Sequence, residues 1–122
     1  MNVKEFAAQA GLSAHTVRYY DKLGLFGALS RNEAGHRRFG KPDLAWMAFI
    51  LRLKETGMPL EQILTYARLR SEGDTTLAAR MALLQQHADA LAQRVALEQQ
   101  HLQKLQEKIA YYQQLISDKP VD

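Results

Sequence analysis

The sequence predicts a mostly α-helical chain with two short N-terminal helices, a small β-hairpin and a long C-terminal coiled-coil helix. Three observations predict this arrangement. Two short amphipathic patterns flank Gly11, a basic glycine-containing segment follows them, and residues 76–117 contain neither Pro nor Gly. We expect residues 1–71 to form one small domain, residues 75–117 a dimerisation helix, and residues 118–122 a tail.

The composition is that of a folded protein. The chain has 122 residues, of which 47% are hydrophobic and 24% charged, enough for one modest core plus an appendage. No run reaches the roughly 18 apolar residues of a membrane span, and the first residues lack the pattern of a secretion signal. With no cysteine, disulfides and thiolate metal sites are excluded. We therefore expect a cytoplasmic protein that does not enter membranes.

The charge is unevenly distributed along the chain. Residues 1–70 contain 11 Lys and Arg against 6 Asp and Glu, whereas residues 71–122 contain 5 against 7. A basic front and an acidic back are typical of a module that faces nucleic acid and is joined to a separate scaffold.

The first two helices are delimited by capping residues. Asn2 is a plausible N-cap with Glu5 three residues later, and Gly11 ends the first helix. Ser13 caps the second helix, which Gly24 ends in a left-handed conformation, so that Leu25 and Phe26 fold back onto the core. Two short helices separated by such a turn predict a helix-turn-helix.

A hairpin and two further helices follow. Turn residues 32–35 separate residues 29–31 from residues 36–39, which predicts a β-hairpin wing, although neither strand is strongly β-prone. A third helix begins near Lys41–Asp43 and ends at Gly57, and Pro59 opens a fourth. Residues 71–74 form the break before the long helix.

The long helix has a heptad pattern. Eleven of its twelve seam positions are apolar, and the twelfth is Glu98, which can set register at some cost in stability. A helix of about 63 Å cannot be buried by so small a domain, so its seam needs a partner, most simply a second copy. The predicted dimerisation residues are Leu77, Met81, Leu84, Ala88, Leu91, Val95, Leu102, Leu105, Ile109 and Tyr112, followed by Ile116.

The second helix offers residues that could read DNA. Early residues of a recognition helix reach base edges in the major groove, and neighbouring basic or hydroxyl groups hold phosphates. The alternative is an ordinary amphipathic helix with a solvated cationic face. The candidate DNA-binding residues are Ser13, His15, Thr16, Arg18, Tyr19, Tyr20 and Lys22.

The predicted wing adds further cationic candidates, namely Arg31, His36, Arg37 and Arg38, with no carboxylate partner expected beyond Glu33. Such a wing can follow a phosphate backbone or enter the minor groove, although a polar surface turn is the alternative. Because adjacent strand residues point to opposite faces, we expect only one of Arg37 and Arg38 to face DNA.

Catalytic and metal-binding patterns are absent from the sequence. The four histidines, His15, His36, His87 and His101, form no metal-ligand spacing, and His87 and His101 share a position that flanks the seam. No phosphate-binding glycine loop or catalytic Ser-His-Asp set is recognisable. We therefore expect no enzymatic activity, no metal and no cofactor. A coiled-coil adaptor whose head binds protein remains the alternative to a DNA-binding protein.

Several segments resemble the MerR family of winged helix-turn-helix transcription regulators. Residues 17–25 are similar to its T-I-R-Y-Y-E-x-x-G-L-L signature, Arg31 with residues 35–39 to its wing, and residues 53–63 to its second helix pair. The resemblance implies an antiparallel coiled-coil homodimer that binds a pseudo-palindromic promoter operator in double-stranded DNA. It also implies that the dimer distorts this DNA for RNA polymerase, and that Arg18, Tyr19, His36 and Arg37 contact mainly the DNA backbone. For Tyr20 it leaves two roles open, a phosphate contact or packing in the head.

Some positions depart from the family pattern. His36 replaces the usual first Tyr of the wing, and Asp21 replaces the more usual Glu. The chain is closest to the NmlR/AdhR-like branch, which typically carries a reactive cysteine in the third helix. Arg52 occupies that position here, so the sensing chemistry does not carry over.

Overall fold

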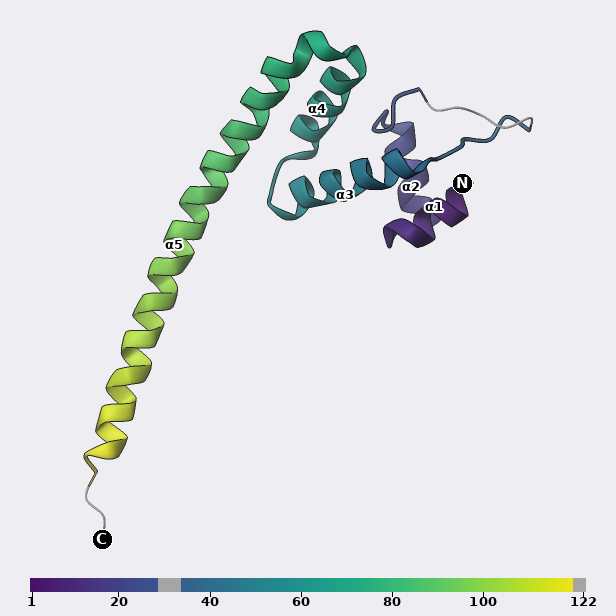
Figure 1. Ribbon diagram of the computed structural model, residues 1–122. Coiled ribbons are helices and arrows are strands. Elements are labelled where there is room, and N and C mark those ends of the chain that lie inside the picture. Colours follow the sequence, from purple (N-terminus) through teal and green to yellow (C-terminus); the bar gives the residue numbers. More distant parts are fainter. Residues whose placement is uncertain (29–33, 120–122) are drawn as a thin grey trace. The chain divides into compact units, whose positions relative to one another are not determined.

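Five α-helices make up most of the described part of the chain. We describe its computed structural model over residues 1–28 and 34–119, in which the helices appear in the predicted order (Figure 1). They are α1 (Val3–Ala10), α2 (Ala14–Lys22), α3 (Lys41–Glu55), α4 (Leu60–Glu72) and α5 (Leu77–Ser117), with a 3₁₀ turn at Asp74–Thr76 between the last two.

The ends of the first helices follow from their caps. The backbone N–H of Glu5 donates to Asn2 Oδ1 at 2.8 Å, and the Asn2 backbone N–H donates to Glu5 Oε1 at 3.2 Å, which completes a capping box. Gly11 ends α1 with a φ of 74°, a left-handed conformation that favours glycine. The predicted caps of both helices are confirmed, because Ser13 also accepts from the Thr16 backbone N–H at 3.1 Å.

The residues Met1–Gln85 form one compact unit around an aromatic core. Phe6 of α1 stacks on Phe39 with ring centroids 4.4 Å apart, and Phe26 meets both rings edge-on. From α3, Trp46 is buried and donates from Nε1 to the Leu25 carbonyl oxygen at 2.9 Å. The segment after α2 is thereby fixed to α3, and the predicted return of Leu25 and Phe26 to the core is confirmed.

A hydrogen-bonded corner joins α4 to α5. Gly73 ends α4 with a φ of 94°. The buried Thr76 hydroxyl lies 2.6 Å from the Leu69 carbonyl oxygen and 2.7 Å from that of Gly73. Arg80 donates to the Thr76 hydroxyl at 3.0 Å and to the Gly73 carbonyl at 3.1 Å, so one side chain closes the corner.

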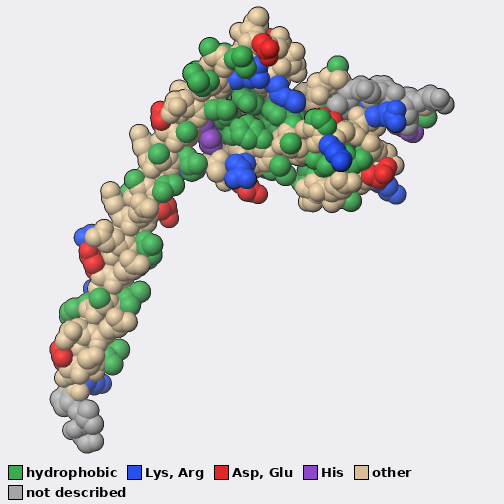
Figure 2. Space-filling view, in the orientation of Figure 1, with side chains coloured by type: hydrophobic (Ala, Val, Ile, Leu, Met, Phe, Trp, Pro, Cys, Tyr) green, Lys and Arg blue, Asp and Glu red, His purple; other side chains and the backbone are tan. Residues whose placement is uncertain are grey.

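The residues Gln86–Asp122 form a second unit, which contains the rest of α5. No side chain of α5 is buried, and apolar side chains recur along its exposed surface (Figure 2). Over the described residues, no helix is both long and apolar enough to cross a membrane.

The predicted β-hairpin is not seen. Its first arm and most of its turn, residues 29–33, lie outside the described residues. In residues 34–40 the backbone is irregular, and only Arg37 has strand-like pairing. In the described arm, His36, Arg37 and Arg38 are not among the β-branched and aromatic residues that are enriched in strands.

Candidate nucleic-acid interface

Helix α2 separates a buried side from a polar exposed side. Val17 is fully buried and Tyr20 is 5% exposed, so these two side chains hold the helix against the core. The opposite side presents polar or cationic side chains. The exposed residues are His15, Arg18, Tyr19 and Lys22, and Thr16 is half-buried.

Two of the predicted DNA-binding residues also build the start of α2. The Ser13 side chain accepts from the Thr16 backbone and its hydroxyl lies 2.9 Å from the Thr16 hydroxyl. Their oxygens therefore lie at the N-terminus of α2, where backbone N–H groups and the helix dipole favour an anion.

Tyr20 packs in the core of the unit formed by Met1–Gln85, and its hydroxyl accepts a hydrogen bond from Lys54 Nζ at 3.0 Å. This hydrogen bond raises the pKa of the exposed Lys54 above its usual value, so the ammonium stays charged at neutral pH. Lys54 lies near the end of α3 and borders an apolar hollow of about 330 Å³ together with Tyr19, Tyr20 and Leu60. It adds a cation beside Tyr19 that the sequence analysis missed, because 34 residues separate Lys54 from Tyr20.

The wing segment, which we define as residues 34–40, is anchored by its last aromatic residue. Phe39 is buried against Phe6 and Phe26, and its backbone N–H donates to the Met1 carbonyl oxygen at 2.8 Å. His36 and Arg38 remain exposed, whereas Arg37 is half-buried. Arg31 lies outside the described residues.

Arg37 is paired with a carboxylate, which corrects the expectation that only Glu33 could serve the wing. Its Nε lies 3.0 Å from Asp21 Oδ2, and the two side chains are 26% and 17% exposed. Asp21 belongs to α2, so this ion pair links the wing segment to the helix that carries Arg18. The sequence pattern does not reveal this ion pair, because Asp21 and Arg37 belong to different elements.

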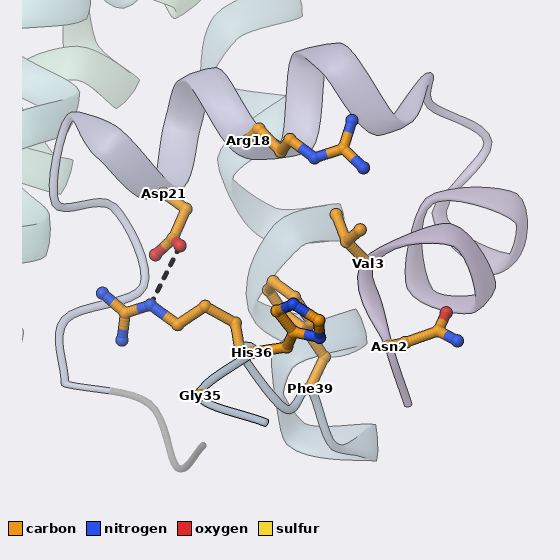
Figure 3. A pocket seen from close by; sticks show the side chains of 8 residues that line it. Asn2, Val3, Arg18, Asp21, Gly35, His36 and Phe39 are labelled. Carbon is orange, nitrogen blue, oxygen red and sulfur yellow. Dashed lines mark ion pairs between the residues drawn. The ribbon is translucent and has the colours of Figure 1, made fainter. Parts of the chain in front are cut away.

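A hollow of about 390 Å³ lies between α1, α2 and the wing segment. Arg18 and Asp21 reach it from α2, His36 from the wing segment and Asn2 from the start of α1 (Figure 3). The dashed line in Figure 3 marks the Asp21–Arg37 pair at one side of it. Two arginines and a histidine thus surround a space with one carboxylate, an arrangement suited to a phosphate group.

The predicted dimerisation residues lie on α5 and leave apolar surface in solvent. Val95 is 47% exposed, Leu102 54% and Leu105 63%. Leu84 differs, because it also packs partly against the core of the first unit. Among the large apolar seam residues, those that are 55% to 72% exposed are Leu77, Met81, Leu105, Ile109, Tyr112 and Ile116.

The chain combines a helix-turn-helix that has a cationic face with a long helix that follows it. This arrangement is typical of helix-turn-helix regulatory proteins. Residues 1–70 match the MerR HTH family regulatory protein model, and residues 44–100 match the model described as MerR, DNA binding. The chain belongs to the MerR family.

Relatives and solved structures agree with this assignment. The transcriptional regulator AdhR of Bacillus subtilis is 37% identical over 84 residues, covering 69% of this chain and 60% of that protein. A MerR family transcriptional regulator from Listeria monocytogenes superposes with a TM-score of 0.85 at 38% identity, over 93% of this chain and 86% of that one. HiNmlR, described as a MerR family regulator lacking the sensor domain and bound to promoter DNA, gives 0.81 at 34%, over 96% and 93%. The chain spans about 60% or less of the first curated relatives it matches.

Proposed function

We propose that the protein is a sequence-specific DNA-binding transcription regulator that acts as a homodimer. The observation that carries the proposal is the cationic surface shared by α2 and the wing segment, where Arg18 and Arg37 flank one hollow. Structural similarity to HiNmlR, whose structure contains promoter DNA, supports it.

The residues of this surface take different roles in the proposal. His15 and Thr16, in the first turn of α2, read base edges in the major groove. Arg18, Lys22, Tyr19 and Arg37 hold phosphates, and Lys54 joins them beside Tyr19. Tyr20 supports this group from the core, since its hydroxyl meets Lys54 at 3.0 Å. The remaining candidates are Ser13, Arg31, His36 and Arg38.

The second part of the proposal is the dimer. Residues 1–71 act as the DNA-binding domain and residues 75–117 as the dimerisation helix. Exposed apolar side chains recur at heptad spacing on α5, and a second copy is the simplest partner for them. An antiparallel pair presents two DNA-binding domains to a pseudo-palindromic promoter operator. In this proposal the bound dimer distorts the promoter DNA for RNA polymerase. Because the energy needed to distort DNA depends on its sequence, DNA stiffness then contributes to which sites the protein binds.

A salt titration on duplex DNA tests the DNA-binding part. Genomic fragments selected with the purified protein supply the operator, and the affinity is then measured from about 50 to 200 mM salt. A DNA-binding protein loses affinity steeply on a log-log plot because phosphate contacts release counterions. A protein-binding adaptor would select no fragment and bind no duplex even at the lowest salt.

A further inference from the structure

An apolar hollow of about 330 Å³ lies within the unit Met1–Gln85, where residues of α2, α3 and α4 surround it. We call it the α2–α4 hollow. Its volume lies within the range of roughly 300–1,000 Å³ that is typical of small-molecule sites. The wall and the rim of the hollow differ in chemistry, and this difference indicates which kind of molecule fits it.

The inner wall of the α2–α4 hollow is apolar. Ile50, Met58 and Ile63 line it, and their side chains are only 2% to 3% exposed. Tyr19 and Leu60 also line it but are 50% and 42% exposed, so they lie where the hollow opens to solvent. An apolar group that enters the hollow therefore leaves water and covers apolar surface of the protein.

The rim of the hollow carries a cation. Lys54 lines the hollow, and its Nζ donates to the Tyr20 hydroxyl at 3.0 Å. Within residues 1–28 and 34–119, Lys54 forms no ion pair with a carboxylate, and none of the residues that line the hollow is acidic. Because an ammonium group has three donors, Lys54 can still donate to an anion at the rim.

The N-terminus of α4 adds a second group that favours negative charge. Leu60 is the first residue of α4, and Pro59 before it gives the first turn no side-chain hydrogen bond. The free N–H groups and the dipole of such a helix end attract an anion. Glu61 belongs to the same turn but does not line the hollow, so Lys54 sets the charge of the hollow.

We propose that the α2–α4 hollow binds a small carboxylate with an apolar body, such as an arylalkyl carboxylic acid. The apolar body lies against Ile50, Met58 and Ile63, and the carboxylate accepts a hydrogen bond from Lys54 Nζ at the rim. A wholly polar anion such as inorganic phosphate would leave the apolar wall uncovered. A neutral apolar molecule would make no use of the ammonium.

The position of the hollow couples this ligand to DNA binding, and this consequence rests on the proposed function. Tyr19 and Lys54 belong to the surface that holds DNA phosphates in that function, and they also line the hollow. A carboxylate bound to Lys54 therefore competes with a DNA phosphate for the same ammonium. By linkage, the ligand weakens DNA binding by the same factor by which DNA weakens ligand binding.

Methyl NMR of the full chain without DNA tests the site. The probe is 4-phenylbutanoate, added to protein with labelled Met and Ile methyl groups. The signals of Ile50, Met58 and Ile63 should shift, whereas those of Met81 and Ile109 on α5 should not. Shifts confined to α5 would place the probe on the exposed seam and overturn the proposed site. Unchanged signals from all three wall residues would overturn it as well.

A neutral analogue of the probe, 4-phenylbutanamide, tests the role of charge. The wild-type protein should bind the carboxylate about three- to fivefold more tightly than the amide, which is the size of an exposed ion pair. Lys54→Gln should bind both and lose this preference. The matched control is Arg52→Gln, which removes an exposed cation of α3 that does not line the hollow and should keep the preference. A wild-type protein without the preference, or a Lys54→Gln variant that retains it, would overturn the assignment of a carboxylate.

Competition with duplex DNA tests the coupling. At constant sodium concentration, saturating 4-phenylbutanoate should weaken duplex binding several-fold, whereas acetate at the same concentration should not. An unchanged duplex affinity with the probe bound would overturn the competition. A protein that binds no duplex with or without the probe would contradict the proposed function instead, and the methyl shifts would still test the site.

Discussion

Arg18 and Arg37 illustrate two ways in which an arginine can be presented at a binding surface. Arg18 is an exposed residue of a capped helix, so local sequence is enough to place it. Arg37 lies in an irregular segment and is held by Asp21 at 3.0 Å. Together they flank the hollow in which we propose that a phosphate binds. Because a helix places Arg18 and an ion pair places Arg37, we expect mutations at these two positions to affect DNA binding differently.

We expect Arg18→Ala to weaken binding to all duplexes by a similar factor. The guanidinium contacts phosphate in the proposal, so its loss should also lower the slope of log affinity against log salt by about one. Lys104→Ala is the control, since Lys104 is an exposed cation of α5 outside the seam. An unchanged slope, with the loss confined to one base-pair position, would show that Arg18 reads sequence instead.

Arg37→Ala should weaken DNA binding more than Arg38→Ala. Arg37 borders the hollow with Arg18, whereas Arg38 does not line it. Titration of each single variant against the same operator measures the difference. Equal losses would contradict this asymmetry.

Asp21→Asn should weaken DNA binding a few-fold, although it removes a negative charge from a surface that binds phosphate. The reason is that Asp21 positions Arg37, and the neutral amide holds a guanidinium less strongly. A double-mutant cycle measures this role, because Asp21→Asn should have little further effect in an Arg37→Ala background. A gain of affinity of equal size in both backgrounds would show that Asp21 acts only as a repelling charge.

At the scale of elements, local signals in the sequence predicted the helices well. Caps and left-handed glycines fix where a helix begins and ends, and Asn2, Gly11, Ser13 and Gly73 act through neighbours a few residues away. The wing segment depends on contacts across the chain instead. Phe39 is held by Phe6 and Phe26, and a periodicity of polar and apolar residues does not reveal such contacts.

In the candidate site, too, local sequence places some residues and contacts between distant parts of the chain place others. The sequence predicted most of the exposed face of α2, because helical periodicity separates Val17 from Arg18, but it left open whether Tyr20 packs in the core or contacts DNA. It did not predict the pairing of Lys54 with Tyr20, which needs α2 and α3 to pack together.

The corner between α4 and α5 gives a prediction about stability. Thr76→Val removes a buried hydroxyl that bonds two carbonyl oxygens and accepts from Arg80. We expect a loss of about 1–2 kcal/mol in the free energy of unfolding, because these groups lose a partner without reaching water. Thr75→Val is the matched control at an exposed neighbouring position, and it should change stability by less than about 0.5 kcal/mol. Urea unfolding measures both, and equal effects would show that the hydroxyl does not hold the corner.

At the scale of the whole molecule, the proposed dimer depends on the exposed seam of α5. An apolar side chain such as Leu91 or Val95 gains roughly 1.5–3 kcal/mol when it is fully buried. Eleven apolar positions in one seam therefore favour association strongly. Linking two DNA-binding domains then raises affinity for a two-part operator, on the order of 10²–10⁴-fold, without any new contact to DNA.

The double variant Leu91→Asp, Val95→Asp should separate the proposed dimer. It places two carboxylates per chain in a seam that excludes water, and dissociation costs less than burying unpaired charges. Analytical ultracentrifugation should show a monomer, and circular dichroism should show that the helices of the head remain. The matched control is Gln93→Asp with Gln100→Asp, which adds the same charge outside the seam and should stay dimeric.

The most direct measurement compares binding to a duplex with the whole operator and to a duplex with one half-site. The wild-type protein should bind the whole operator at least 100-fold more tightly than the half-site, as linked binding predicts. The Leu91→Asp, Val95→Asp monomer should bind both duplexes equally, near the affinity of the wild-type protein for the half-site. A monomeric variant that keeps the full preference for the whole operator, or a wild-type protein without that preference, would contradict a regulator built from two linked DNA-binding domains.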